Sequence, residues 1–404
     1  MFGSEFSHYL SYGATDQKTV IALSGHFDGL LVPGTVAAFQ KEGTGGFVLA
    51  MSAASATMNY AIDPRFPLFQ QALSFPKKSH EALAKLLGLP SLIRSADPQP
   101  EDFTPEIIRT VARNWADFNK SYKHNAGGKF EKYAKRLDED LGQEDAQQPT
   151  FIFPPYLITH TRNDGWWKIS ELLFKETCSS VGDGDRCVRV VATSNVELLE
   201  ELALSVEDDR MGLWVSGLDE LTRTSNELAT YGRAIAAVAL AGKRTFAFYG
   251  GFFSVLLNTI GLGGASHGIG YGESRQWKEL PESGPPPSRY YVPQLHRYLQ
   301  PDEATRLLVA DRRLSECHCP ECHGDPPNTL DYQALMKHSV YCRAREIKEW
   351  SGMSIGDAAK RLAADSRDWH QILKQSGLPN VLLSAARRRA AHLQTWVDAL
   401  SQIP

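Results

Sequence analysis

Long hydrophobic runs are missing from this sequence. Its 404 residues contain no stretch of about 18 consecutive apolar side chains, the length that a transmembrane helix needs. The opening segment, MFGSEFSHYL, also lacks the basic start and the apolar middle of a secretory signal peptide. We therefore expect a protein without a membrane partner.

Cysteine is scarce as well. The chain has six cysteines, and three of them fall within residues 317–322. A disulfide framework would spread paired cysteines along a short secreted chain, whereas clustered thiols in a long chain are typical of a metal site in a reducing compartment. This distribution predicts a cytoplasmic protein.

A large excess of charge is the third absence. The net charge of −4 excludes a uniformly basic nucleic-acid binder, although it allows a local basic face. Basic side chains gather in segment 120–136, where Lys123 stands between Tyr122 and His124, and again at Arg387–Arg389. Such segments are typical of surfaces that contact RNA or DNA, and equally of ordinary solvated helices.

Alternating strand and helix patterns dominate the chain from residue 150 onward. The expected strands are 151–153, 188–192, 211–215, 245–248 and 264–270. The helices between them begin near residues 168, 196, 219 and 252. A spacing of roughly 25–35 residues per unit is typical of β-α units around a parallel sheet.

Two earlier β-rich runs, 19–23 and 47–51, bring the expected strands to about seven. This number favours an α/β fold of the (β/α)₈ TIM-barrel type over an open doubly wound sheet. The expected regions are the first barrel strands in 1–75, a helical insertion in 76–149, the remainder of the barrel in 150–300, and a zinc-stapled helical C-terminal region in 301–404. Segment 281–300 is expected to be a proline-rich loop, and four helices are expected after Asp331.

The segment SECHCPECHG places Cys317, Cys319 and Cys322 in a C-x-C-x-x-C pattern. A tight turn with this spacing aims three thiolates at one point, and a closed structural zinc site then needs a fourth ligand. His338 lies near the start of an expected helix, and Cys342 follows one helical turn later on the same face. The pattern predicts one structural zinc ion held by the three cysteines and His338, with Cys342 as the alternative fourth ligand.

Because this cluster follows the last strands of a barrel, the chain resembles the tRNA-guanine transglycosylases, the superfamily of queuine and archaeosine tRNA-ribosyltransferases. The resemblance is strongest over 245–350, in Tyr249-Gly250-Gly251, Glu316-Cys317-His318-Cys319 and Leu335-Met336-Lys337-His338; over 1–240 it is one of architecture. That family exchanges guanine for a 7-deazaguanine base in tRNA, and relatives act on archaeal tRNA or on DNA. The resemblance implies a transferase whose zinc pins the C-terminal region to the barrel.

The resemblance also implies two catalytic aspartates, an acid/base group after an early strand and a nucleophile after a late strand. The chain has Met51 at the early position, and Ser266–Ile269 at the late position holds no carboxylate. A nucleophile at a sugar carbon needs an ionised oxygen, so Asp63 or Glu273 would have to carry the chemistry instead. Both follow expected strands, at the end of a barrel where active sites lie, but such acids also cap helices or form surface ion pairs.

A further group of residues is expected to bind the substrate: Tyr249, Gly250, Gly251, His267, Lys123 and Arg275. Tyr249, Gly250 and Gly251 belong to the segment that carries the resemblance, and Lys123 belongs to the first basic segment. The glycines of the nearby GIGYGES segment, residues 268–274, could let a ligand approach the backbone closely. A lone histidine at a strand end, such as His267, is equally typical of a buried structural residue.

These observations support three functional hypotheses. The first is a divergent transglycosylase-like zinc protein that binds or modifies a nucleobase in RNA or DNA. The second is a catalytically inactive barrel that serves as a binding or scaffold subunit, as a homodimer or in a hetero-complex. The third is a glycosidase-like or nucleotide-metabolising barrel unrelated to tRNA, for which a pocket without a basic surround would be expected.

Overall fold

Eight parallel strands form the centre of the protein. The computed structural model describes residues 1–3, 5–13, 17–55, 57–125, 127–137, 140–270, 272–278 and 287–404. The strands are β1 (Ser7–Ser11), β2 (Gly29–Pro33), β3 (Asn59–Asp63), β4 (Phe151–Ile152), β5 (Arg189–Thr193), β6 (Arg210–Val215), β7 (Arg244–Ala247) and β8 (Leu262–His267). They are arranged in the order β4-β3-β2-β1-β8-β7-β6-β5, and every printed pair is parallel.

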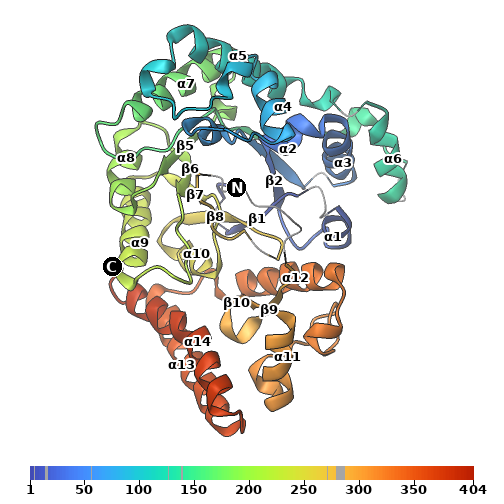
Figure 1. Ribbon diagram of the computed structural model, residues 1–404, viewed down its shortest axis with the longest axis vertical. Helices are drawn as coiled ribbons and strands as arrows, with labels where there is room; N and C mark the ends of the chain where they lie inside the picture. The colour runs from blue at the N-terminus through green and yellow to red at the C-terminus, as the bar shows by residue number, and fades with distance from the viewer. Residues whose placement is uncertain are drawn as a thin grey trace.

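The sheet curls until its two edge strands meet (Figure 1). Isolated parallel bridges join Ile152 to Cys187 and Thr159 to Thr193, so the chain beyond β4 reaches β5. The predicted (β/α)₈ fold class is therefore confirmed.

Helices between the strands cover the outside of the barrel. They are α1 (Gln17–Ala22), α2 (Gly34–Phe39), α3 (Lys41–Ala54), α4 (Lys78–Leu86), α5 (Pro105–Lys120), α6 (Phe130–Ala134), α7 (Gly165–Val181), α8 (Leu199–Ser205), α9 (Ser225–Leu240) and α10 (Phe252–Leu256). Local sequence starts several of them, as at α5, where the Thr104 hydroxyl accepts a hydrogen bond from the Ile107 amide and Pro105 occupies the first turn.

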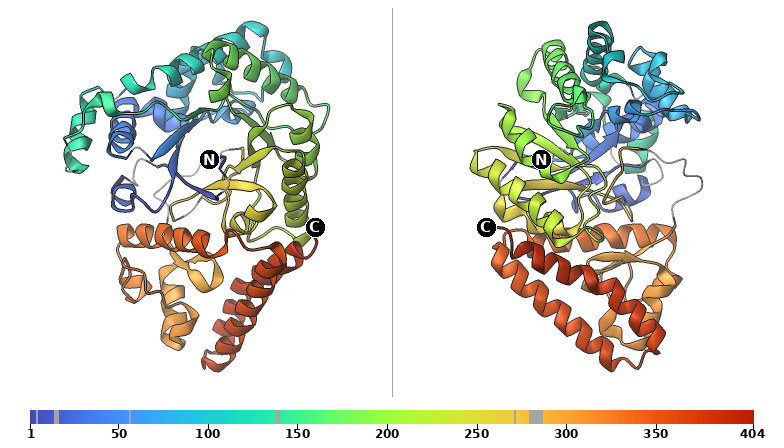
Figure 2. Two further views of the ribbon diagram at one scale, coloured as in Figure 1. Left: turned by 180° about the vertical axis from the view of Figure 1, so that it is seen from behind. Right: turned by 60° about the vertical axis from the view of Figure 1, so that its left-hand side comes forward.

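The C-terminal region lies beside the barrel (Figure 2). It contains the antiparallel pair β9 (Tyr290–Val292) and β10 (Arg297–Leu299), and the helices α11 (Pro301–Ala310), α12 (Tyr332–Trp350), α13 (Ile355–Gln375) and α14 (Asn380–Leu400). None of the described helices combines the length and the apolar character needed to cross a membrane.

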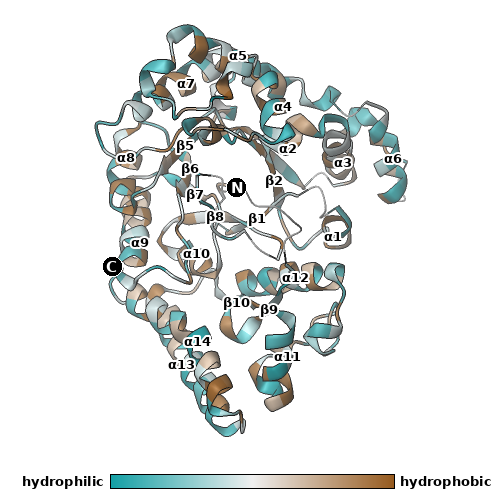
Figure 3. Ribbon diagram, viewed as in Figure 1, coloured by the Kyte–Doolittle hydropathy of each residue, from teal (hydrophilic) through white to brown (hydrophobic). Residues whose placement is uncertain are grey.

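Large aromatic side chains fill the inside of the barrel. This interior cluster includes Tyr9, Phe153, Tyr156, Trp214, Phe246 and Phe248. Glycines on neighbouring strands make room for them, because a Cβ atom at Gly29 would lie 2.5 Å from the Tyr9 ring and one at Gly212 would lie 2.8 Å from the Phe248 ring. The second, larger cluster packs the helices on the outer face of the sheet, and Figure 3 shows hydrophobic residues both on strands and on the helices around them.

The expectations for the first 75 residues were wrong in part. Segments 19–23 and 47–51 lie mainly in α1 and α3, not in strands. Helix α3 is buried along most of its length, so it lacks the polar face that marks a helix in a sequence. The strands β1, β2 and β3 escaped notice because they are short, with no strict alternation.

Two expectations for the C-terminal region also need correction. The expected loop over 281–300 contains the hairpin β9–β10, although residues 281–286 lie outside the described chain. Three α-helices follow Asp331, and not four, because α13 and α14 each run unbroken for 21 residues.

We expect Gly29→Ala to destabilise the fold by about 1–3 kcal/mol, because the added Cβ would lie 2.5 Å from the Asn59 carbonyl oxygen as well as from the Tyr9 ring. Gly356→Ala is the matched control, since nothing lies within 4 Å of a Cβ at that position in α13. Chemical denaturation of both variants measures the difference. Equal stability of the two variants would contradict this account of barrel packing.

Candidate metal centre and barrel mouth

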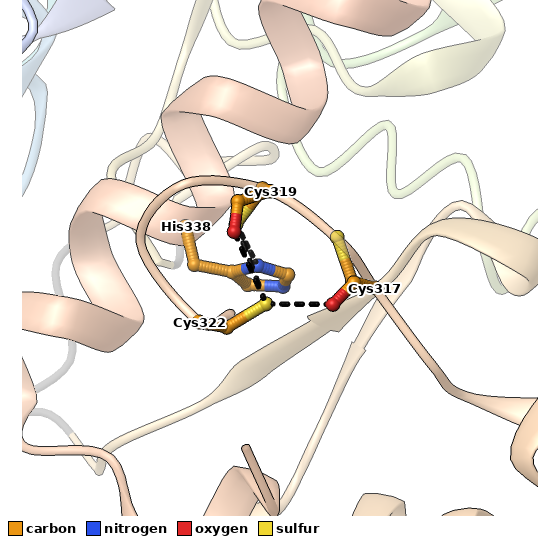
Figure 4. Close-up of side chains that lie close together, drawn as sticks. All are labelled: Cys317, Cys319, Cys322 and His338. Atoms are coloured by element: carbon orange, nitrogen blue, oxygen red, sulfur yellow. Dashed lines mark hydrogen bonds between the residues drawn. The ribbon is translucent and has the colours of Figure 1, made fainter. Parts of the chain in front are cut away.

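Four buried side chains meet at one point beside the barrel. Cys317, Cys319 and Cys322 come from the loop between α11 and α12, and His338 comes from the second turn of α12 (Figure 4). Their ligand atoms all lie within 4.8 Å of one another. The sequence expectation of a three-cysteine, one-histidine cluster is therefore matched by a compact group that can hold a metal ion.

The histidine is oriented for metal binding. Its Nε2 atom lies 2.7 Å from the Tyr291 carbonyl oxygen, which can only accept, so Nε2 carries the proton. Its Nδ1 atom, 3.3 Å from the Cys319 sulfur, therefore presents a lone pair to the thiols. The Tyr290 ring stacks on the imidazole at a centroid distance of 4.2 Å and holds it in place. Metal-ligating histidines commonly have such a partner on the second nitrogen.

Cys342 lies next to this group without belonging to the compact set of four. Its sulfur is 3.7 Å from the Cys317 sulfur and 3.7 Å from His338 Nδ1. Both candidates for the fourth ligand thus face the cluster, as expected for positions one helical turn apart on α12.

We expect His338→Ala and Cys319→Ser to lose the bound metal, and Cys342→Ser to retain one ion per chain. Metal content measured by mass spectrometry after gel filtration distinguishes these outcomes. The metal-free variants should also melt at a lower temperature, because binding energy at a structural site contributes to folding. Loss of the ion from Cys342→Ser together with its retention in His338→Ala would assign the fourth position to Cys342.

Asp63 stands at the carboxyl end of β3 and points into the barrel. Ala61 belongs to the interior cluster, and alternate residues of a strand share a face. The carboxylate accepts hydrogen bonds from the hydroxyls of Tyr156 (2.8 Å) and Tyr249 (2.9 Å). It also accepts from the Arg65 amide (3.0 Å) and forms an ion pair with the Arg65 guanidinium (2.8 Å). These four contacts match the number of acceptor sites on a carboxylate.

Aromatic and cationic side chains surround this carboxylate. The guanidinium of Arg65 lies 5.2 Å from the centre of the Tyr249 ring, and that of Arg275 lies 6.0 Å from it. Trp214 packs edge-on against the same ring. Arg65 and Tyr249 both have positive φ values, 54° and 59°, which is a strained backbone for such side chains and is often found at functional sites.

Two half-buried residues extend the aromatic surface. Trp277 is fixed through its amide, which donates to the Ser216 hydroxyl at 3.0 Å, and its ring lies 5.4 Å from that of His160. His160 comes after the carboxyl end of β4, and Trp277 lies in the loop after β8. Both rings therefore lie on the same side of the barrel as Asp63.

Glu273, in the loop after β8, joins a buried ion-pair network. Its carboxylate lies 2.6 Å from Arg343 of α12, whose guanidinium also donates to Glu346 at 2.9 Å. Burial raises the pKa of Glu273 to about 7; Arg343 opposes this shift, and the neighbouring Glu220 adds to it. Glu220 and Glu273 both lie against Gly251, and burial raises the pKa of Glu220 as well.

Gly250 and Gly251 are packed by protein atoms. A Cβ at Gly250 would lie 2.7 Å from the Ser254 hydroxyl, and one at Gly251 would lie 2.6 Å from Glu220. The Glu220 carboxylate accepts hydrogen bonds from the amides of Gly251, Phe253 and Ser254 at the start of α10. The close packing at these two positions therefore requires glycine whether or not a substrate binds there.

The remaining two candidates lie away from Asp63. Ser266 pairs with the interior residue Tyr9, so His267 points to the outer face of β8, where its ring packs against His8. Burial, Arg343 and His8 lower the pKa of His267 well below its usual range, so the ring is neutral. Lys123 follows the end of α5 and contacts the segment that leads into β4, at the amino end of the barrel.

Comparison with known proteins adds little to this geometry. No protein family matches the sequence, and no curated protein matches it. Among solved structures, the chain is similar to a protein provisionally described as a fructose-1,6-biphosphate aldolase from Coccidioides immitis, over 86% of this chain and 90% of that one. The identity is 8% and the TM-score is 0.36, so this likeness carries no inference about function.

Sequence reasoning missed four residues of the mouth and its surroundings: Arg65, Tyr156, Glu220 and Arg343. Arg65 stands two positions after the candidate acid Asp63, and Tyr156 follows the expected strand 151–153. Their places next to a candidate acid and a strand end are the features by which the sequence could have indicated them. Arg343 stands next to Cys342, but nothing in the sequence indicates that it reaches Glu273. Glu220 has no distinguishing pattern.

We expect the free energy of unfolding to fall as pH rises from about 5 to 7, with a contribution from Glu273 of up to about 3 kcal/mol. The folded-state pKa of about 7 is above the ordinary glutamate value of 4.5, so the folded chain binds this proton more tightly than the unfolded chain. The stability gained from this tighter binding is lost when the pH rises and Glu273 deprotonates. In Glu273→Gln the fall should be smaller. Denaturation across this pH range, with the exposed Glu207→Gln as control, tests the assignment; identical slopes in all three proteins would refute it.

Proposed function

We propose that this protein is a transglycosylase-like zinc protein that binds a nucleobase of RNA or DNA at the carboxyl end of its barrel. The observation that carries this proposal is the constellation around Asp63. A carboxylate, two tyrosines and the guanidiniums of Arg65 and Arg275 converge where barrel active sites lie. Aromatic faces and guanidinium planes stack on bases, and carboxylates accept hydrogen bonds from their edges.

The donor set supports zinc as the metal. Three thiolates and one imidazole suit a four-coordinate ion, and no position is left open for a substrate, so the role is structural. Helix α12 carries both His338 and Arg343, whose guanidinium reaches Glu273. The metal would thus hold in place the helix that completes the wall beside the barrel mouth.

Glu273 is the residue proposed to move protons. A pKa of about 7 allows a carboxyl group both to donate a proton to a departing base nitrogen and to take one from an incoming base. In base exchange, the bond between C1′ of the sugar and the first base breaks, and a bond to the second base forms. Asp63 is the carboxylate proposed to bond to C1′ as the first base departs, after one of its tyrosine contacts is released, and to leave C1′ again as the second base attacks.

One observation favours the inactive binding subunit as a second candidate. All four acceptor sites of Asp63 are in use within the protein, so its oxygens are not free to attack a sugar carbon. A barrel with such a carboxylate would bind a base or a partner without turnover.

We expect the purified protein to incorporate labelled guanine, or a 7-deazaguanine base, into nucleic acid, with Glu273→Gln at least about 100-fold slower because it cannot transfer the proton. Asp63→Asn should also be inactive, whereas Glu207→Gln, an exposed acid far from the mouth, should equal the unmodified protein. Base binding without exchange would select the inactive subunit. Neither binding nor exchange, in a protein that contains its zinc, would overturn both candidates.

A further inference from the structure

Helices α13 and α14 form an antiparallel hairpin that projects from the barrel (Figures 1 and 2). A groove of about 710 Å³ runs between them. Ala390 and Ala391 line it from α14, and their small side chains help to keep it open. The groove is separate from the metal centre and from the Asp63 constellation.

Every ionisable side chain that lines this groove is basic. Arg367, His370 and Lys374 stand at i, i+3 and i+7 on one face of α13, and Arg387 faces them from α14. Among the described residues, none of the three long cations has a carboxylate partner.

Other cations of the same hairpin are neutralised. Lys360 pairs with Asp357, and Arg389 pairs with Glu303. Like charges gathered without counter-charges repel one another, so their concentration in one groove of a chain with net charge −4 is costly unless an anion lies there.

The row of cations on α13 is long enough to follow the backbone of a nucleic-acid strand. Arg367 and Lys374 are seven residues apart, which is about 10 Å along a helix axis. A row of this length can contact more than one successive phosphate of a strand.

We infer that the α13–α14 groove binds the phosphodiester backbone of a single nucleic-acid strand. The inference rests on the proposed function for the kind of partner, and it adds the place where that partner's backbone is held. A membrane surface fits less well, because the lining contains no large apolar side chain to enter a bilayer.

The test is binding of a fluorescein-labelled, single-stranded 20-nucleotide oligothymidylate to the full-length protein, followed by anisotropy over a range of salt concentrations. In the triple variant Arg367→Gln, Lys374→Gln, Arg387→Gln, affinity at low salt should fall at least tenfold. The slope of log affinity against log salt should fall by about 2, since each phosphate contact to a single strand contributes about 0.7. All three residues are exposed, so the fold should be unaffected.

The matched control is Lys348→Gln, Lys360→Gln, Arg388→Gln, which removes the same charge from exposed positions outside the groove. This control variant should show the same slope of log affinity against log salt as the unmodified protein. An equal loss of affinity in both triple variants would mean that only the net charge of the protein matters, and it would overturn the inference. So would an absence of oligothymidylate binding, or groove-dependent binding to phosphatidylserine vesicles in its place.

This experiment separates the groove from the barrel mouth. Glu207→Gln, an exposed acid outside both sites, should bind oligothymidylate as the unmodified protein does. If oligothymidylate binding depends on the groove but neither base exchange nor base binding is found, the proposed function fails and the inference about the groove is supported. If base exchange is found and the groove variant binds normally, the groove inference fails and the proposed function stands.

Discussion

A buried guanidinium that must be neutralised connects the parts of this protein. Arg343 of α12 is almost fully buried, and such a charge is tolerated in a protein interior only when it is paired. It pairs with Glu273 from the loop after β8 and with Glu346 from its own helix. Tyr291 of β9 and His296 of the β9–β10 turn contact Glu346 in turn. The barrel, the small hairpin and the helix that carries His338 therefore meet in one polar network.

That network also sets the character of the barrel mouth. Burial of the Glu273 carboxyl, with Glu220 close by, outweighs the opposing charge of Arg343, and the result is a pKa of about 7 for Glu273. Asp63 is different, because tyrosine hydroxyls and Arg65 surround it and occupy its oxygens. Two carboxylates with such different environments are the usual basis for dividing acid/base and charge-holding roles.

The sequence was informative where local chemistry is strong. The C-x-C-x-x-C pattern and His338 could be identified because metal ligands are specified by residue type and spacing. The later β-α units were found because β5, β6 and β7 are buried hydrophobic runs separated by helices with clear starts. The early strands were not found, because β1 carries serine, histidine and tyrosine, and α3 resembles a buried strand. For the same reason Met51, which lies in a helix, says nothing about an acid at a strand end.

The sequence by itself thus determined the cluster of cysteines and histidine that can hold a metal ion, the repeating β-α organisation and the basic character of the C-terminal helices, since each depends on neighbouring residues. Tertiary structure alone decided which residues meet at the mouth. Tyr249 reaches Asp63 across 186 positions, and Arg343 reaches Glu273 across 70. It also decided that Lys123 lies at the opposite end of the barrel and that His267 faces outward. Barrel closure and the pleat of each strand set such relations, and these depend on how the whole sheet curls rather than on any local segment.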